Sequence, residues 1–292
     1  MYRITSAETI APEIRRIEVE AAAVARKHQA GQFVILRVTP TGERIPLTIG
    51  AADIAAGTIT LFVQAVGRTT RLLNLLEAGD FISDIAGPLG RPSDIEDYGR
   101  AVVVGGGLGT AIAYPVARAL VLAGNEVVAI VGGRTEEHVL LEAELRTAGA
   151  DVVPCTDDGS YGRAGFVTDA LHELLESEQA VDVVFAAGPV PMMRAVAETT
   201  RPFGIRTIAS LNPIMVDGTG MCGGCRVDIG GETKFACVDG PEFDAHLVDF
   251  DLLDRRNRAY AEFEGHRRDD LSHLDACHIE QLLAPVRGAD AS

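Results

Sequence analysis

Apolar and polar side chains alternate in short runs along the first 98 residues, and glycine and proline separate these runs. Residues 32–38 read Gln-Phe-Val-Ile-Leu-Arg-Val, and residues 57–63 read Gly-Thr-Ile-Thr-Leu-Phe-Val. A period of two is typical of strands with one buried face, so several such runs predict a small antiparallel barrel. One helix is expected within it over residues 70–78, because four leucines lie between positions 72 and 76.

After the barrel, continuous apolar runs alternate with segments of helical periodicity. Residues 101–104 are apolar throughout, as in a fully buried strand, and an apolar helix is expected to end near Leu122. Another strand is expected over residues 126–131, and two strand–helix units over residues 151–175 and 181–199. This alternation predicts a parallel sheet with helices on both faces.

The helical pattern stops at Leu211, and glycine and cysteine dominate as far as Gly240. The charged remainder, from Pro241, is expected to form one or two surface helices. The predicted fold class is therefore a β barrel plus an α/β domain, with a small third module. Four parts are predicted: a barrel (1–98), a parallel-sheet α/β domain (99–210), a cysteine module (211–250) and a helical tail (251–292).

Composition limits the possible partners and location of the protein. Its 26 basic and 42 acidic residues give a formal net charge of −16, which disfavours nucleic acid and anionic membranes as partners. No run approaches the roughly 18 apolar residues of a membrane span, and the N-terminal residues lack the apolar stretch of a signal peptide. We therefore expect a cytoplasmic protein. The odd number of cysteines, with three of the five crowded into residues 222–237, favours ligand chemistry over disulfides.

A glycine-rich loop lies between the first strand and first helix of the α/β domain. Gly105, Gly107 and Gly109 let backbone N–H groups approach a pyrophosphate. Thr110 opens the helix, whose N-terminus attracts negative charge. Because the loop joins a buried strand to a helix, dinucleotide binding is favoured over a simple turn.

Three other strand ends offer nucleotide contacts. The second strand lacks the acidic residue that usually binds the ribose 2′-hydroxyl, and runs instead into Arg134, which either pairs with a 2′-phosphate or lies on the solvated rim. Asp157 and Asp158 follow the third strand and either accept from the adenosine ribose or cap a turn. Gly188 and Pro189 follow the fourth, where the missing side chain of Gly188 would admit a nicotinamide ring. The choice between NADH and NADPH stays open.

The barrel carries a candidate flavin motif at residues 44–48, Arg-Ile-Pro-Leu-Thr. Arg44 can pair with a pyrophosphate and Thr48 can hydrogen-bond a flavin ring nitrogen, while Pro46 fixes the backbone between them. Taken alone, the motif also fits an ordinary strand end. A second candidate anion site, or else a simple threonine helix cap, precedes the barrel helix at Gly67, Thr69 and Thr70.

The most specific signal is a set of three cysteines and one aspartate. Asp217, Cys222, Cys225 and Cys237 stand at the spacing of a plant-type [2Fe–2S] site, with aspartate in the place of the first cysteine. Glycines at four positions between 218 and 224 allow the chain to wrap closely around a cluster. A zinc site is the alternative, although structural zinc ligands usually come in two separated pairs. Asp217 is either the fourth ligand or a residue that supports one.

These motifs together resemble the ferredoxin–NADP reductase superfamily, which has an FAD-binding barrel followed by a nicotinamide-binding α/β domain. Where many members stack an aromatic residue on the flavin, this chain has Leu47, as suits the branch of electron-transfer subunits. Residues 211–226, 235–243 and 156–169 more specifically resemble the small subunits of NADH-dependent ferredoxin:NADP oxidoreductase and sulfide dehydrogenase. In that family an aspartate is the first cluster ligand, which implies the same role for Asp217.

The resemblance implies a function in electron transfer. NAD(P)H would deliver hydride to FAD, and single electrons would pass through the [2Fe–2S] cluster to or from a larger flavoprotein and iron–sulfur subunit, with ferredoxin reached through that subunit. Thr48 would contact the flavin, and Arg44 and Thr70 would hold its phosphates. Flavin-based electron bifurcation is one activity of such complexes. The alternatives are the electron-transfer subunit of dihydroorotate dehydrogenase, which has cysteine in the place of Asp217, and a redox sensor without turnover.

Overall fold

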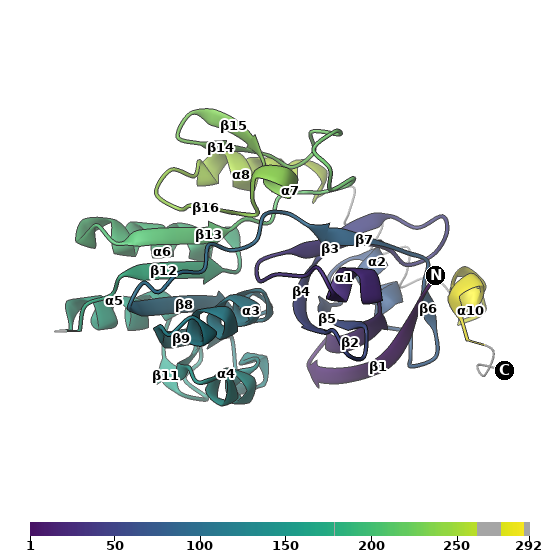
Figure 1. The fold of residues 1–292 in the computed structure, drawn as a ribbon, viewed down its shortest axis with the longest axis horizontal. Helices are drawn as coiled ribbons and strands as arrows, with labels where there is room; N and C mark the ends of the chain where they lie inside the picture. Colours follow the sequence, from purple (N-terminus) through teal and green to yellow (C-terminus); the bar gives the residue numbers. More distant parts are fainter. Residues whose placement is uncertain (178, 262–275, 289–292) are drawn as a thin grey trace.

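The structure, a computed structural model, describes residues 1–177, 179–261 and 276–288. It contains two seven-stranded sheets with a small module across their junction (Figure 1). The first sheet has the order β6-β1-β2-β5-β4-β3-β7, and every pairing in it is antiparallel. Its strands are β1 (Tyr2–Ala11), β2 (Ile14–Glu20), β3 (Phe33–Arg37), β4 (Arg44–Asp53), β5 (Thr58–Gln64), β6 (Phe81–Ile82) and β7 (Asp84–Leu89). The predicted antiparallel barrel is confirmed.

Strand β3 is apolar on both faces because it serves two cores. Val34 and Leu36 point into the barrel, where they pack with Ile49 and Leu61. Phe33 and Ile35 alternate with them and belong to a second core beneath the α/β domain and the cysteine module. The barrel is therefore joined to the rest of the molecule through the outer face of this strand.

The barrel helix differs from the prediction. Besides a short helix α1 (Ala22–Ala25), the barrel has α2 (Arg68–Leu73), which begins before residue 70 and ends well before residue 78. The guanidinium group of Arg15 donates to the carbonyls of Asn74 and Leu76 at 2.6 and 2.9 Å. These carbonyls accept hydrogen bonds from a β2 side chain instead of from a following helical turn, so the helix can end there.

The second sheet has the order β11-β10-β9-β8-β12-β13-β16. All its pairings are parallel except that of the edge strand β16, which the sequence pattern did not reveal. The strands are β8 (Arg100–Gly106), β9 (Glu126–Gly133), β10 (Asp151–Thr156), β11 (Arg163–Ala164), β12 (Val183–Ala187), β13 (Arg206–Ser210) and β16 (Glu242–Asp244). Helices α3 (Gly109–Leu122) and α4 (Glu142–Ala148) cover one face, and α5 (Val167–Glu176) and α6 (Val190–Thr200) cover the other.

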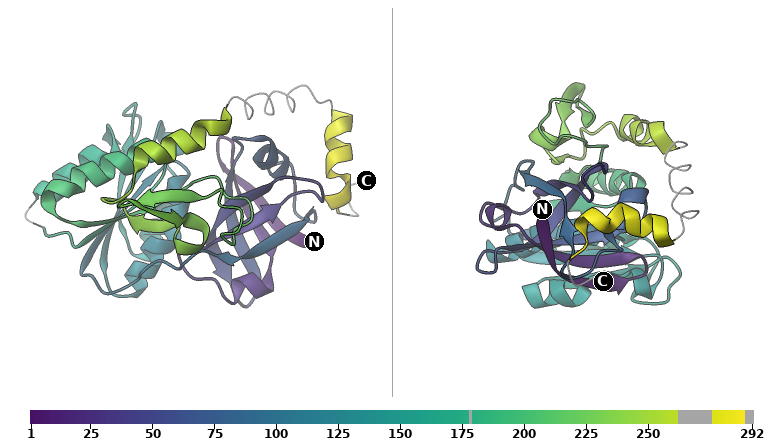
Figure 2. Two further views of the ribbon diagram at one scale, coloured as in Figure 1. Left: turned by 90° about the horizontal axis from the view of Figure 1, so that it is seen from above. Right: turned by 90° about the vertical axis from the view of Figure 1, so that its right-hand side faces the viewer.

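The cysteine module consists of the loop after β13, the hairpin β14 (Arg226–Ile229) and β15 (Glu232–Phe235), and the short helix α7 (Ala236–Asp239). It lies over the junction of the two larger sheets in both Figure 1 and Figure 2. Helix α8 (Phe250–Asn257) packs against α6 and β14 and so supports the module from the α/β side. Short 3₁₀ helices complete the described chain: Glu136–His138, Arg201–Phe203, Arg258–Tyr260 and Ala284–Val286.

The end of the chain is not only a surface helix, as the charge pattern had suggested. Helix α10 (Ala276–Leu283) lies beside the barrel (Figure 2), and Leu283 and Val286 are fully buried in the barrel core. Asp80 anchors the segment by accepting from Arg287 Nη1 at 2.6 Å and from the backbone N–H of Gly288 at 3.0 Å. These two residues escaped prediction because the segment was interpreted from the charge of the whole tail, although residues 276–288 themselves are mostly apolar. No helix in the described part of the chain is long and apolar enough to cross a membrane.

We predict that Asp80→Ala lowers the free energy of unfolding by roughly 3 kcal/mol, because it removes the buried carboxylate that pairs with the mostly buried Arg287 guanidinium at 2.6 Å. Within the described chain, Arg287 then keeps only the Leu75 carbonyl at 3.1 Å and the exposed Glu280 carboxylate at 3.4 Å. Urea unfolding followed by circular dichroism measures the change. Glu232→Ala is the control, since its ion pair with Lys234 is exposed to solvent and should contribute little to stability. Equal stability of the two variants would contradict the anchoring role of Asp80.

Candidate functional site

The glycine loop of the α/β domain is shaped by close packing on one side and by open space on the other. A Cβ on Gly109 would lie 2.1 Å from the carbonyl oxygen of Ala187, so only glycine allows α3 to start this close to the end of β12. Gly107 has a φ of +54° and no atom within 4 Å of such a Cβ. The Thr110 hydroxyl beneath the loop is buried without a hydrogen-bond partner among the described residues. A backbone cradle with one unused hydroxyl fits a bound pyrophosphate.

The other predicted nucleotide contacts gather at the same edge of the sheet. Gly188 lies against the glycine loop: a Cβ on Gly188 would lie 3.4 Å from the backbone nitrogen of Gly106. The neighbouring Pro189 is exposed. Arg134 is exposed and makes no ion pair in the described chain, while the backbone N–H of Asp158 donates to its carbonyl at 3.3 Å. The Asp158 carboxylate accepts from the Ser160 hydroxyl at 2.7 Å, and this hydrogen bond lowers the pKa of Asp158.

Asp157 and Asp158 are thus both exposed, but only Asp158 is committed to a turn. The structure therefore leaves the Asp157 carboxylate, together with the guanidinium group of Arg134, available to a nucleotide at this edge. Their roles as nucleotide ligands stay predictions.

The flavin motif on β4 presents alternate residues to opposite sides of the barrel. Leu47 packs against the barrel core, so the neighbouring Pro46 and Thr48 point outward, on the side of Arg44. Thr48 stands opposite Phe33 and Pro46 opposite Ile35, and directly paired residues share one face of a sheet. The predicted flavin contacts therefore lie on the outer face of the barrel, toward the other two modules. Leu47 is placed away from that face, so a stacking role for its side chain is not supported by this arrangement.

The first turn of α2 uses its hydroxyl groups within the protein. Thr69 is buried and donates to Glu43 Oε2 at 2.9 Å, and Thr70 exchanges hydrogen bonds with the backbone of Gly67. Their predicted contribution to phosphate binding would therefore have to come from backbone N–H groups. Arg68, which was not among the predicted site residues, has a buried Nε without a hydrogen-bond partner in the described chain. Arg68 stands between Gly67 and Thr69 of the predicted anion site, and this position could have identified it.

The loop that begins at Asp217 is folded around its carboxylate. Oδ1 accepts from the backbone N–H of Thr219 at 3.0 Å, and Oδ2 accepts from that of Cys222 at 2.9 Å. These hydrogen bonds, the one from Thr219 first, lower the pKa of Asp217, so the side chain is a carboxylate near neutrality. Asp217 therefore helps to position Cys222 in this structure, which fits either of the two roles that the sequence left open.

Two of the three cysteines of the predicted cluster site are in contact. Cys225 Sγ lies 3.2 Å from Cys237 Sγ, and both thiols are buried, whereas Cys222 is exposed. The backbone N–H of Gly220 is directed at Cys237, and that of Gly224 donates to Cys222 Sγ at 3.4 Å. Burial, and then the neighbouring Cys225 thiol, raise the pKa of Cys237 to about 12. Thiolates are the ligands of metals, so metal binding at such a pair displaces protons.

This donor set fits a [2Fe–2S] cluster. A dinuclear cluster takes two protein ligands at each iron. The chain supplies the close thiol pair Cys225 and Cys237, and a second pair, Asp217 and Cys222, which a hydrogen bond from the Cys222 backbone to the carboxylate joins. Backbone N–H groups directed at the sulfurs are typical of such sites. In the described chain, no three His, Cys, Asp or Glu side chains are grouped as they would be around one metal ion. Cys155, on β10, is buried away from the group.

The cluster loop and the flavin face of the barrel are in contact. Gly218, next to Asp217, has a φ of +76°, and a Cβ on it would lie 2.6 Å from Leu89 Cδ1 and 2.8 Å from Ile35 Cγ1. Ile35 stands opposite Pro46 in the sheet. Ile35 of β3 therefore lies between the strand that carries the predicted flavin motif and the loop that carries the predicted cluster ligands, and contacts both. The Arg256 guanidinium on α8 also holds the loop, donating to the Gly224 carbonyl at 3.2 Å, a contact that sequence spacing could not reveal.

An antiparallel barrel, a parallel α/β sheet with a dinucleotide loop and a cysteine module define a flavin- and iron–sulfur-type oxidoreductase. Comparisons with known proteins agree with this class. The family model of the iron–sulfur cluster binding domain of dihydroorotate dehydrogenase B matches residues 212–249, and that of the oxidoreductase NAD-binding domain matches residues 103–198. The first match favours the cluster over the zinc alternative.

Relatives extend the similarity over most of the chain. The electron transfer subunit homolog of dihydroorotate dehydrogenase B (NAD(+)) from Thermotoga maritima is 45% identical over 255 residues, covering 87% of this chain and 90% of that protein. The corresponding electron transfer subunit from Geobacillus thermodenitrificans is 35% identical, covering 84% and 96%. A chain in the structure of NADH-dependent reduced ferredoxin-NADP oxidoreductase superposes with a TM-score of 0.88 and 41% identity, covering 93% and 98%.

The chain therefore belongs to the family of electron-transfer subunits that includes those of dihydroorotate dehydrogenase B, within the ferredoxin–NADP reductase superfamily. It is an oxidoreductase subunit, and the predicted cofactor set of FAD, a [2Fe–2S] cluster and NAD(H) is that of its family. Both subfamilies anticipated from the sequence, the NADH-dependent ferredoxin:NADP oxidoreductase type and the dihydroorotate dehydrogenase type, are represented among these relatives.

Two substitutions separate the two possible roles of Asp217. If the carboxylate is an iron ligand, Asp217→Cys retains a cluster with a shifted potential and visible spectrum, whereas Asp217→Asn loses most of the cluster. If it only positions Cys222, Asp217→Asn keeps an acceptor for a backbone N–H and leaves the spectrum unchanged. We predict the first result, measured as iron and sulfide per chain and by electron paramagnetic resonance of the reduced protein.

Proposed function

We propose that this chain carries electrons between NAD(H), FAD and a [2Fe–2S] cluster, and exchanges them with a larger flavoprotein subunit. The observation that supports this most strongly is the contact of Gly218 with Ile35 and Leu89, which puts the cluster loop against the sheet face that carries Thr48. Short separation is what electron transfer between two centres requires. The cofactors supply the redox chemistry, and the protein orients them and controls their surroundings.

The chain's own residues would divide the binding work among the three modules. Arg44 and Thr48, on the outer face of β4, would hold the flavin and hydrogen-bond its ring. The loop at Gly107 and the hydroxyl of Thr110 would hold the nucleotide pyrophosphate, and Gly188 would leave space for the nicotinamide ring. Asp217, Cys222, Cys225 and Cys237 would hold the cluster, with Arg256 and the loop glycines fixing the backbone around it.

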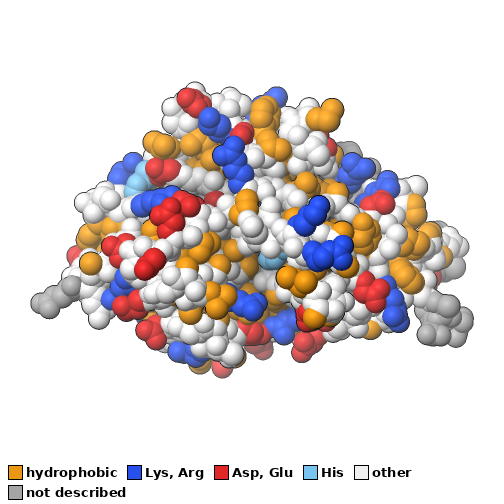
Figure 3. All heavy atoms as spheres, viewed as in Figure 1, with side chains coloured by type: hydrophobic (Ala, Val, Ile, Leu, Met, Phe, Trp, Pro, Cys, Tyr) orange, Lys and Arg blue, Asp and Glu red, His pale blue; other side chains and the backbone are white. Residues whose placement is uncertain are grey.

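The surface beside the cluster loop suits contact with a partner. Met221 is 88% exposed directly before Cys222, and Val216, directly before Asp217, is also exposed. In Figure 3, hydrophobic side chains stand at the top of the molecule, where the cysteine module lies. Exposed apolar residues around a redox centre are typical of a docking surface. We propose that the larger subunit meets the chain here and that ferredoxin reacts through that subunit.

The relatives include two types of electron-transfer subunit, and this chain is proposed to belong to one of them. The NADH-dependent ferredoxin:NADP oxidoreductase type of subunit is favoured by aspartate at position 217, where the dihydroorotate dehydrogenase pattern has cysteine. Whether the complex bifurcates electrons depends on the larger subunit, because the described part of this chain has no second group of cysteines. A cytoplasmic location stays a prediction.

Substitution of Thr48 tests the placement of the flavin. Thr48→Val keeps the β-branched shape and removes the hydroxyl, and loss of one hydrogen bond corresponds to roughly 1 kcal/mol, or about a fivefold change. We predict about fivefold weaker flavin binding or slower flavin reduction by NADH, with iron and sulfide content unchanged. Thr60→Val on β5 is the matched control, and equal behaviour of both variants would place the flavin elsewhere.

Isolation of the native complex tests the subunit assignment. The tagged chain, purified without oxygen from its source cells, should bring with it one larger protein that contains flavin and iron–sulfur clusters. Met221→Glu should release that protein and leave the cofactors of this chain in place. Recovery of the chain alone, fully loaded and able to reduce a final acceptor by itself, would contradict the proposal.

A further inference from the structure

Glu242 is a partly buried residue whose carboxyl group lies where four parts of the chain meet, and none of the proposed cofactor contacts uses it. It lies on β16, opposite Ser210 of β13. Its Oε1 accepts from the hydroxyl of Ser93 at 2.7 Å, and Ser93 belongs to the connection between the barrel and the α/β domain. A Cβ on Gly31, just before β3, would lie 3.1 Å from the same oxygen. The barrel, the connection, the α/β sheet and the end of the cysteine module therefore all reach this group.

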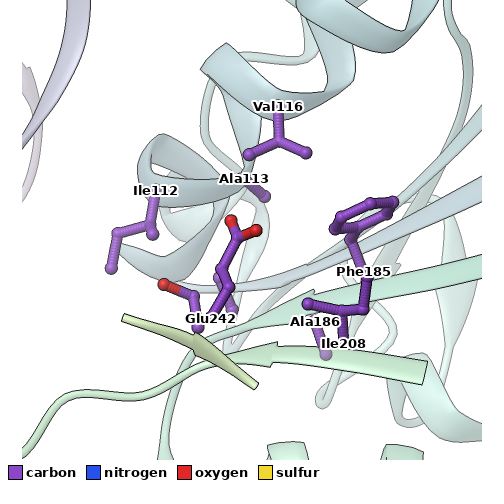
Figure 4. A pocket seen from close by; sticks show the side chains of 9 residues that line it. Ile112, Ala113, Val116, Phe185, Ala186, Ile208 and Glu242 are labelled. Carbon is purple, nitrogen blue, oxygen red and sulfur yellow. The ribbon is translucent and has the colours of Figure 1, made fainter. Parts of the chain in front are cut away.

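The surroundings of the carboxyl group are almost entirely apolar. It points into a crevice of about 10 Å³, the volume of about one water molecule. Figure 4 shows the carboxyl group between side chains from α3 and from strands β12 and β13. The apolar lining residues include Ile112, Val116, Phe185 and Ile208.

The charged neighbours of Glu242 are few. Asp94, next to Ser93, is the nearby carboxylate, and it pairs with Arg206 at 2.9 Å. The lining elements α3, β12 and β13 present apolar side chains and Ser210, the barrel presents Gly31, and no cation in the described chain stabilises the Glu242 carboxylate. Burial, opposed by the Ser93 hydrogen bond and aided by Asp94, raises the pKa of Glu242 to about 7. Both protonation states are therefore accessible near neutrality.

The position of this group also links the two proposed redox centres. β3 begins beside Gly31, and its Phe33 stands opposite Thr48, the proposed flavin contact. On the other side, Gly240 and Pro241 connect Glu242 to the α7 segment that carries Cys237. An electron added to either centre brings negative charge closer to a carboxylate in apolar surroundings, which disfavours the ionised form.

We propose that Glu242 is a redox-linked protonation site, which takes up one proton from solvent when a redox centre of this chain takes up an electron. The electron comes from NADH through the proposed function, on which this inference rests. The proton comes from water, one O–H bond forms at the carboxylate, and reoxidation returns the proton to solvent. The crevice, with room for one water molecule, provides a place from which the proton can arrive.

This linkage has a definite sign. Reduction raises the proton affinity of Glu242, so the midpoint potential falls with rising pH between the pKa of the oxidised form and the higher pKa of the reduced form. A tenfold rise in proton affinity corresponds to about 59 mV for one electron. Glu242→Gln, which resembles the protonated form, should abolish this part of the pH dependence and hold the potential near the low-pH value of the natural protein.

The test is a pair of measurements on the full chain loaded with its cofactors. Flavin and cluster potentials are titrated from pH 6 to pH 9, and reduced-minus-oxidised infrared spectra report the C=O stretch of a newly protonated carboxyl group. We expect this band in the natural protein and not in Glu242→Gln. Ser93→Ala should move the break in the potential curve to higher pH, since the lost hydrogen bond stabilises the carboxylate. Glu232→Gln, which changes an exposed carboxyl group on β15, should behave as the natural protein.

The outcomes separate this inference from the proposed function. Parallel potential curves for the natural protein and Glu242→Gln, without a carboxyl band, would overturn the protonation site while leaving electron transfer intact. If Glu242→Gln does not bind its cofactors, the infrared spectra of the natural protein and of Ser93→Ala decide the question. Absence of the band there overturns the inference, and a band that Ser93→Ala shifts supports it. A purified chain without flavin and iron would overturn the proposed function and this inference together.

Discussion

The arrangement of the molecule depends on the close approach of the cluster loop to the outer face of the barrel. Gly218 touches Ile35 and Leu89 so closely that a single additional carbon atom would overlap both side chains. The same face of the sheet continues through Pro46 to Thr48. A loop that must wrap around a cluster is thereby held against the strand proposed to bind the flavin. Separate modules with a wider gap could bind the same cofactors, but electrons would pass between them more slowly.

Other contacts of the module maintain this approach from the opposite side. The Arg256 guanidinium on α8 holds the Gly224 carbonyl, and β16 adds the end of the module to the α/β sheet as an antiparallel edge strand. The backbone N–H of Arg91 in the connection donates to the Gly240 carbonyl at 2.6 Å. Each larger domain is thus tied to the cysteine module independently. The junction is a packed interface, which explains how the Glu242 side chain becomes partly buried there.

The sequence predicted the parts that repeat a local pattern. Alternation identified the barrel strands, and continuous apolar runs identified the parallel strands, because burial on one face or on two leaves a direct trace in the residues. The cysteine spacing identified the cluster module for a similar reason. What escaped prediction depends on contacts distant in sequence: Arg15 ends α2, Leu283 and Val286 fill the barrel core, and β16 joins a sheet begun more than a hundred residues earlier. The orientation of Leu47 into the barrel also required the strand register, which the motif alone does not contain.

The central proposal is that NADH, the flavin and the cluster form one connected electron path within this chain. An anaerobic titration of the purified chain with NADH tests this directly, with visible absorption and electron paramagnetic resonance recorded together. We expect the flavin absorption to bleach and the signal of a reduced [2Fe–2S] cluster to appear in the same chain without any partner present. A flavin that NADH reduces while the cluster stays oxidised, even though dithionite reduces it, would contradict the connected path.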